Sequence, residues 1–191
     1  MKRALVIFGL VLLSAGLFAQ ESDDISPQRK QAIDSLALEK VRDLSKYVSI
    51  IGNKDTPWSE AQRVIERAVE LFMPGSEMGV SSLSRPEVHY YKIREYFDRL
   101  MQLNYDRVVI EWYKIQYVSD LERQPDGTYV GVITIFQSFK GYDNEMGLVY
   151  KDTTKKDITI YVKRKETQIG GRLIGFWDVL LGDIRVKETS K

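Results

Sequence analysis

The sequence of 191 residues contains no cysteine and one histidine, His89. The absence of cysteine excludes disulfide bonds, thiol nucleophiles and thiolate-bound zinc or iron–sulfur centres. A single histidine without cysteines does not supply the ligands of a typical zinc site, so we expect no metal and no cofactor. The fold must rest on its apolar core, for which the chain has 3 tryptophans, 7 phenylalanines and 11 tyrosines.

The chain also lacks an excess of charge of either sign. Its 28 basic and 27 acidic residues give a formal net charge of +1. Such a balance provides no electrostatic attraction to nucleic acid or to an anionic membrane, and we expect neither as a partner. A phosphate-binding glycine loop and a Gly-x-Ser-x-Gly sequence are both missing, so the sequence carries no signature of nucleotide binding or serine hydrolysis.

The first 20 residues have the order of a secretory signal. Lys2 and Arg3 precede an apolar run at residues 4–13, and small residues follow up to Ala19 and Gln20. The run is shorter than the roughly 20 residues of a membrane-spanning helix, and no cysteine follows it for a lipid anchor. We expect a signal peptide at 1–20, cleavage near Ala19-Gln20, and one periplasmic or secreted domain at 21–191. The alternative is an uncleaved membrane anchor or a buried helix.

The next part of the chain has helical spacing of its apolar residues. Ser26 and the following proline predict a helix over 27–51, and a second helix is predicted from Pro57 to the Pro74-Gly75 pair. Residues 78–83 fit a short strand, and 90–103 fit a third helix. Residues 84–87 resemble a helix capping box, although Pro86 also favours an extended backbone there.

From residue 105 onward the apolar period becomes two. Strands are predicted over 107–119, 128–142, 156–165 and 172–181, with a turn at 124–127, a long polar connection at 143–154 and a bulge or bend at 182–183. The fold class is therefore α+β, with three N-terminal helices wrapped on a strongly curved, mostly antiparallel sheet in the order α-α-β-α-β-β-β-β. Apolar residues on both faces of 128–142 indicate either a covered outer face, such as a homodimer interface, or a bulge.

This order of elements resembles the nuclear transport factor 2-like superfamily, the cystatin-like α+β cone. The segments that carry the resemblance are the helix ending at 69–72, the helix at 91–100 and the aromatic strand at 108–113. The resemblance implies a pocket between a bent sheet and its helices. Some members are enzymes, such as ketosteroid isomerase, scytalone dehydratase and the polyketide cyclases. Others only bind ligands or proteins, and many dimerise through the outer sheet face. No catalytic residue of the superfamily can be matched to a position here.

Candidate pocket residues come from the aromatic strands. Glu111 is a carboxylate within an apolar strand, so burial in the pocket would raise its pKa and make it a base. The alternative is a solvent-facing Glu111, because Trp112 beside it must face the opposite way. The side chains that could line a pocket for a flat apolar molecule, or else pack as ordinary core and rim, are Glu111, Trp112, Tyr117, Gln137 and Tyr161.

Three classes of function remain open. The first is an exported, non-catalytic domain that binds a small apolar ligand or a protein partner. The second is an isomerase, dehydratase or cyclase that uses Glu111 or His89 as a base. The third is an inhibitor or assembly factor that adds its sheet edge to a partner. His89 precedes a predicted helix, where a surface or capping role is the simpler interpretation.

Overall fold

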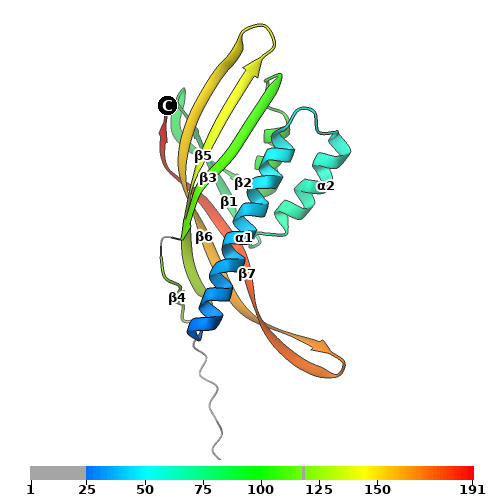
Figure 1. Cartoon of the computed structure of the whole chain (residues 1–191), viewed down its shortest axis with the longest axis vertical. Coiled ribbons are helices and arrows are strands. Elements are labelled where there is room, and N and C mark those ends of the chain that lie inside the picture. The colour runs from blue at the N-terminus through cyan, green and yellow to red at the C-terminus, as the bar shows by residue number, and fades with distance from the viewer. Residues whose placement is uncertain (1–24, 118) are drawn as a thin grey trace, which may run out of the picture.

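The protein is described here by a computed structural model, which covers residues 25–117 and 119–191. Three helices lie against a seven-stranded sheet that curves strongly along its length (Figure 1). This arrangement confirms the predicted α+β fold. The predicted signal peptide lies outside the described residues. Within the described ranges, no helix is both long enough and apolar enough to cross a membrane.

Two long helices form the outer layer. Helix α1 (Pro27–Gly52) begins as predicted, because the Ser26 hydroxyl accepts a hydrogen bond from the Arg29 amide at 3.4 Å. Helix α2 (Trp58–Val69) packs beside it (Figure 1). It ends before the predicted Pro74-Gly75 stop. The chain then bonds to the sheet: the Met73 amide donates to the Leu181 carbonyl at 2.7 Å.

A hairpin that the sequence only partly revealed precedes the third helix. Strand β1 (Glu77–Ser82) was predicted, but β2 (Arg85–Lys92) was not. Of the two interpretations of residues 84–87, the extended one is correct. Residues up to Lys92 pair with β1, so helix α3 (Ile93–Met101) starts three residues later than predicted. Pairing with a neighbouring strand outweighed local helical spacing.

The remaining strands are β3 (Arg107–Tyr117), β4 (Glu122–Arg123), β5 (Tyr129–Asp143), β6 (Gly147–Ile169) and β7 (Arg172–Ser190). Of these, β6 and β7 are longer than the sequence indicated, β5 has the predicted length, and β3 ends two residues before the predicted position 119. The predicted turn at 124–127 joins β4 to β5. The predicted polar connection at 143–154 is wrong: a tight turn leads directly into β6. Asp143 Oδ1 accepts hydrogen bonds from the amides of Glu145 and Met146, and Gly147 adopts a φ of 77°.

The sheet has the strand order β2-β1-β7-β6-β5-β3, with β4 on the side of β5. All pairings are antiparallel except the short β1–β7 contact. The predicted bulge at 182–183 is confirmed. Ile158 pairs with Ile184 and Ile160 with Leu181, so two residues of β7 stand opposite one of β6. This extra residue bends the strand and contributes to the curvature.

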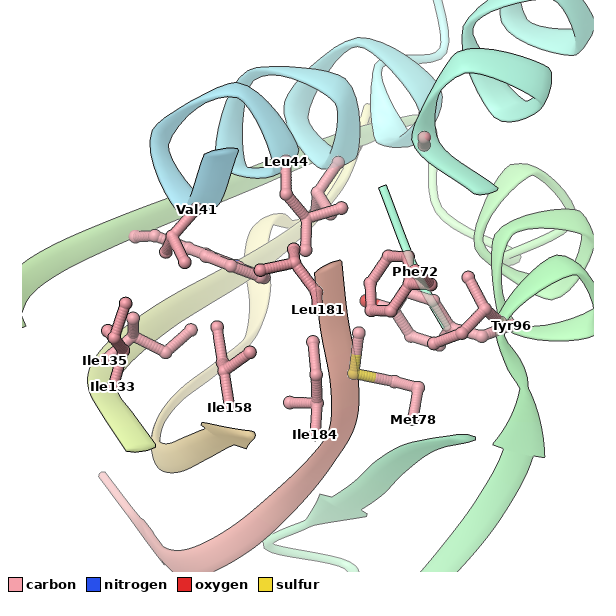
Figure 2. Packing of buried hydrophobic residues seen from close by; sticks show 14 of the residues in the cluster. Val41, Leu44, Phe72, Met78, Tyr96, Ile133, Ile135, Ile158, Leu181 and Ile184 are labelled. Atoms are coloured by element: carbon pink, nitrogen blue, oxygen red, sulfur yellow. The ribbon is translucent and has the colours of Figure 1, made fainter. Parts of the chain in front are cut away.

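The core fills the space between α1 and the middle of the sheet. Figure 2 shows Val41 and Leu44 of α1 above Leu181 and Ile184 of β7, with Ile158 beside them. Each such side chain contributes roughly 1.5–3 kcal/mol when fully buried. On the other face of β5, Phe136 is only half-buried and stacks on Tyr113 with ring centres 5.8 Å apart. The homodimer through that outer face stays a prediction.

Candidate functional site

One row of side chains on three neighbouring strands shares a face of the sheet. Residues that pair directly across strands share a face. The register between β3 and β5 pairs Ile110 with Phe139 and Trp112 with Gln137. The register between β5 and β6 continues the same face onto β6. The members of this row are Ile110, Trp112, Gln137, Phe139, Asp152, Thr154 and Lys156.

A cavity of about 430 Å³ lies between this row, α3 and the β1–β2 hairpin. Its walls are largely apolar or aromatic. They include Leu100 of α3, Leu103 just after it, and Phe139 of β5, together with several tyrosine rings. Pockets for small organic ligands typically enclose 300–1,000 Å³ and combine apolar walls with a few placed polar groups. The polar groups of this cavity therefore determine what it can hold.

The first polar group is the pair formed by Tyr150 and Asp152 of β6. The Tyr150 hydroxyl donates a hydrogen bond to Asp152 Oδ2 at 2.6 Å and accepts one from the Leu83 amide at 2.9 Å. Asp152 is 4 % exposed. Burial raises its pKa, although the Tyr150 hydrogen bond and the Lys156 charge oppose that shift. Burial and the adjacent carboxylate raise the pKa of Tyr150 to about 12.

The second polar group is Lys156, in the middle of β6. Its side chain is 2 % exposed, which is rare for lysine. Nζ lies 3.7 Å from the sulfur of Met78 and 5.9 Å from the centre of the Tyr96 ring. Within residues 25–117 and 119–191, no carboxylate oxygen lies within 4.0 Å of Lys156 Nζ, so the ammonium group has no ion-pair partner there. Burial lowers the pKa of this amine to about 8, and Asp152 opposes the shift.

Two further donors line the same space. Gln137 Oε1 accepts a hydrogen bond from the Trp112 indole at 3.1 Å. An indole can only donate, so the amide NH₂ of Gln137 remains for the cavity. Tyr96 of α3 is buried, and its pKa is raised by that burial. In the described part of the chain, no group is hydrogen-bonded to its hydroxyl.

The structure brings together only part of the predicted set. Gln137 lines the cavity, and Trp112 lies behind it as its hydrogen-bond donor. Glu111 stands on the opposite face, as alternation requires. Its side chain is 62 % exposed and its Oε2 lies 3.7 Å from Lys140 Nζ. Glu111 therefore does not face the cavity. Tyr161 is also on the opposite face, half-buried against Gly182.

Two other predicted residues have different outcomes. The backbone of Tyr117 pairs with Ile133 at the end of β3, and its side chain lies outside the described part of the molecule. His89 of β2 is exposed and lines the cavity, so it stands near the polar groups without being buried among them. Its role as a base stays a prediction.

Sequence reasoning missed Asp152, Lys156, Tyr150 and Tyr96. A usable signal existed for the first two. Ile158 and Ile160 are fully buried, and Thr154, Lys156 and Asp152 continue the same alternation toward the start of β6. Extending the strand backward would have placed a lysine and an aspartate on the core face. Interpreting 143–154 as a loop concealed this, because a loop has no alternation.

Comparison with known proteins gives only distant likenesses. No protein-family model matches the chain, and no curated protein shows significant sequence similarity to it. Among solved structures, it is similar to a scytalone dehydratase-like protein from Novosphingobium aromaticivorans. That likeness has 11 % identity and a TM-score of 0.41, and it covers 85 % of this chain and 90 % of the other.

A second similar structure is a type 2 hexachlorocyclohexane dehydrochlorinase, with 12 % identity and a TM-score of 0.40, over 84 % of this chain and 91 % of the other. At these values neither likeness bears on the chemistry of the cavity. The fold itself, with helices wrapped on a strongly curved sheet, is the one that the resemblance to the nuclear transport factor 2-like superfamily implied.

Proposed function

We propose that this chain is a ligand-binding domain whose cavity holds one small, mostly apolar organic molecule with a polar group at one end. The observation that carries the proposal is the combination of apolar walls with polar groups at one end of the cavity. An apolar and aromatic space of about 430 Å³ ends on Asp152, Lys156 and the free amide of Gln137. A ligand oxygen could accept from Lys156, whose hydrogen-bond partner is the Met78 sulfur, and from the Gln137 amide NH₂.

The hydrogen-bond donors of the cavity favour a ligand with an oxygen acceptor. Lys156 and the Gln137 NH₂ both donate, and neither uses its donors on a protein oxygen. A carbonyl, hydroxyl or carboxylate oxygen on the ligand would accept from them. The rest of the molecule would pack against the side chains of Leu100, Leu103 and Phe139.

Binding can be tested with the fluorescent probe 1-N-phenylnaphthylamine and protein produced from the full-length sequence. We expect saturable binding by the wild-type protein. Val80→Trp adds an indole to the cavity wall and should abolish binding. The matched control is Val149→Trp, an exposed position of β6 away from the cavity. Equal binding by both variants, or an absence of saturable binding by the wild type, would refute the proposal.

The enzyme alternative is favoured by one observation, the Tyr150–Asp152 pair. A buried carboxyl group with a raised pKa, hydrogen-bonded on one oxygen, can transfer a proton to or from a bound molecule. An isomerase or dehydratase of small molecules would place Asp152 in the role that the sequence assigned to Glu111 or His89. If Asp152→Asn left the rate of any detected turnover unchanged, that role would be excluded.

Export is part of the proposal. The order of charge, apolar run and small residues in the first 20 positions supports it. Cell fractionation followed by intact-mass measurement tests it. We expect a chain that begins near residue 20 or 21 in the periplasmic or culture fraction. A full-length mass in the cytoplasmic fraction would contradict export.

A further inference from the structure

We propose that Lys156 forms an imine with an aldehyde or ketone held in the cavity. This inference rests on the proposed function, because it requires the cavity to take an organic ligand. It goes further by naming the reactive group of the ligand, a carbonyl, and the protein atom that bonds to it, Lys156 Nζ.

The position of the amine carries the inference. Lys156 lies in the middle of β6, where its side chain is buried and lines the cavity. Its Nζ has a thioether and an aromatic ring as neighbours, namely Met78 and Tyr96, and no carboxylate within ion-pair distance in the described residues. A structural lysine inside a protein is normally paired. An amine without an ion-pair partner that lines a largely apolar cavity is available for reaction with a molecule bound in that cavity.

The surroundings also favour the neutral, nucleophilic form of the amine. Burial lowers its pKa to about 8. At pH 7 about a tenth of the molecules then carry a neutral amine, against roughly one in three thousand for an ordinary lysine. Desolvation of this kind is how lysines become nucleophiles toward carbonyl groups.

The other ionisable groups of the cavity do not cancel this effect. Asp152 is the group that opposes it, and its own carboxylate is disfavoured by burial. Arg99 is bound to Glu95 at 3.0 Å and lies over the Tyr91 ring. β1 and β5 contribute no ionisable side chain to the lining. The ionisable groups that line the cavity from the remaining elements are Arg85, His89, Tyr91, Tyr96, Arg99, Tyr105, Tyr150 and Asp152.

The reaction needs no redox partner. The Nζ lone pair adds to the carbonyl carbon and forms a C–N bond, the π electrons of the C=O bond move to the oxygen, and one proton passes from the nitrogen to that oxygen. The resulting carbinolamine loses this hydroxyl as water once a second proton reaches it, and a protonated C=N bond remains on Lys156. Asp152 can supply the proton in its acid form, which burial favours. Tyr150 fixes one carboxyl oxygen by its hydrogen bond and leaves the other for proton transfer.

Reductive trapping tests the inference directly. Protein produced from the full-length sequence is incubated with hexanal or benzaldehyde and sodium cyanoborohydride at pH 7, and labelled lysines are located by peptide mass mapping. We expect labelling of Lys156 to begin at least tenfold faster than labelling of Lys151. That lysine is the matched control, because it lies on the same strand and is exposed. Labelling at Lys156 no faster than at Lys151 would overturn the inference.

Two variants and a pH series sharpen the result. Val80→Trp should slow labelling of Lys156 and leave that of Lys151 unchanged, and equal labelling of Lys156 in this variant would overturn the route through the cavity. Lys156→Met should lose the fast labelling site. The rate at Lys156 should rise with pH to a plateau above about 8.

The two proposals fail in different ways. If the probe binds and Val80→Trp blocks it, but Lys156 is not labelled, the imine is wrong and the ligand-binding function stands. If neither the probe nor the aldehydes reach the cavity, both are wrong. The labelling pattern of the wild-type protein decides the matter even if Lys156→Met fails to fold.

Discussion

Asp152 and Lys156 stand four residues apart on the same face of β6, buried in the same cavity, and no ion pair within 4.0 Å joins them. Asp152 is bonded to Tyr150 instead, and the Lys156 amine lies against Met78. Burial disfavours the charged form of each, so their pKa values move toward one another. A complete salt bridge would have moved them apart. Neither group therefore neutralises the other.

Replacing Lys156 with methionine should stabilise the protein. Burial lowers the pKa of the amine from 10.5 to about 8, so below pH 8 the folded state holds an unfavourable charge. The unfolded state binds more protons between pH 8 and 10.5, and this lysine therefore makes stability rise over that interval. At pH 7 we expect Lys156→Met to gain up to about 3 kcal/mol in the free energy of unfolding.

Urea unfolding at pH 7 and pH 10 measures this effect. The gain from Lys156→Met should shrink at pH 10, where the wild-type amine is neutral. Lys151→Met, at an exposed site of the same strand, should change stability little at either pH. A loss of stability in Lys156→Met would show that the ammonium has a stabilising partner.

The Trp112–Gln137 pair predicts strong coupling between two substitutions. Trp112→Phe removes the indole donor and leaves the buried Gln137 oxygen without a partner, which should cost about 1–3 kcal/mol. Gln137→Leu removes the other partner. In the double variant no orphaned group remains, so its loss of stability should be smaller than the sum of the two single losses. Additive losses in urea unfolding would mean that the hydrogen bond contributes nothing.

Gly141 should not tolerate a side chain. A Cβ there would lie 2.5 Å from Cε1 of Tyr105, a residue that lines the cavity. The ring would have to move, and we expect Gly141→Ala to cost about 1–3 kcal/mol and to weaken binding of 1-N-phenylnaphthylamine. Adding Tyr105→Leu should recover most of the stability.

Gly175→Ala is the control for this steric effect, because its new Cβ would lie 3.4 Å from the flexible Arg164 side chain. Its effect on the melting temperature should be small. Equal losses in the two alanine variants would contradict the assignment to Tyr105.

Tyr150 ties the β1–β2 turn to the cavity. Its hydroxyl accepts a hydrogen bond from the Leu83 amide and donates one to Asp152. Tyr150→Phe removes both, so the Leu83 amide should exchange with solvent about tenfold faster, which corresponds to ~1.4 kcal/mol. Tyr142→Phe is the control, since that ring lies under Arg107 at 3.7 Å, away from the turn. Unchanged protection of the Leu83 amide from exchange in Tyr150→Phe would show that the Tyr150 hydroxyl does not stabilise the turn.

The sequence predicted the layers well because periodicity and caps are local signals. Ser26 and the proline after it marked the start of α1, and Gly182-Asp183 marked the bulge in β7. The sequence indicated only part of the set of residues that line the cavity. Of the five pocket residues, Gln137 lines the cavity and Trp112 supports it, whereas Glu111 and Tyr161 face the other way. Strand alternation relates neighbours to each other but does not say which face is inside.

By itself, therefore, the sequence determined the fold class, the absence of thiol chemistry and the near balance of charge. These follow from composition and from spacing within single elements. Only the tertiary structure decided that β6 begins at Gly147 and that Lys156 and Asp152 line one cavity together with Tyr96. Those residues come from one strand and a helix that are far apart in the chain. Their place around one cavity depends on the register between β5 and β6 and on the bend of the sheet, which no local pattern encodes.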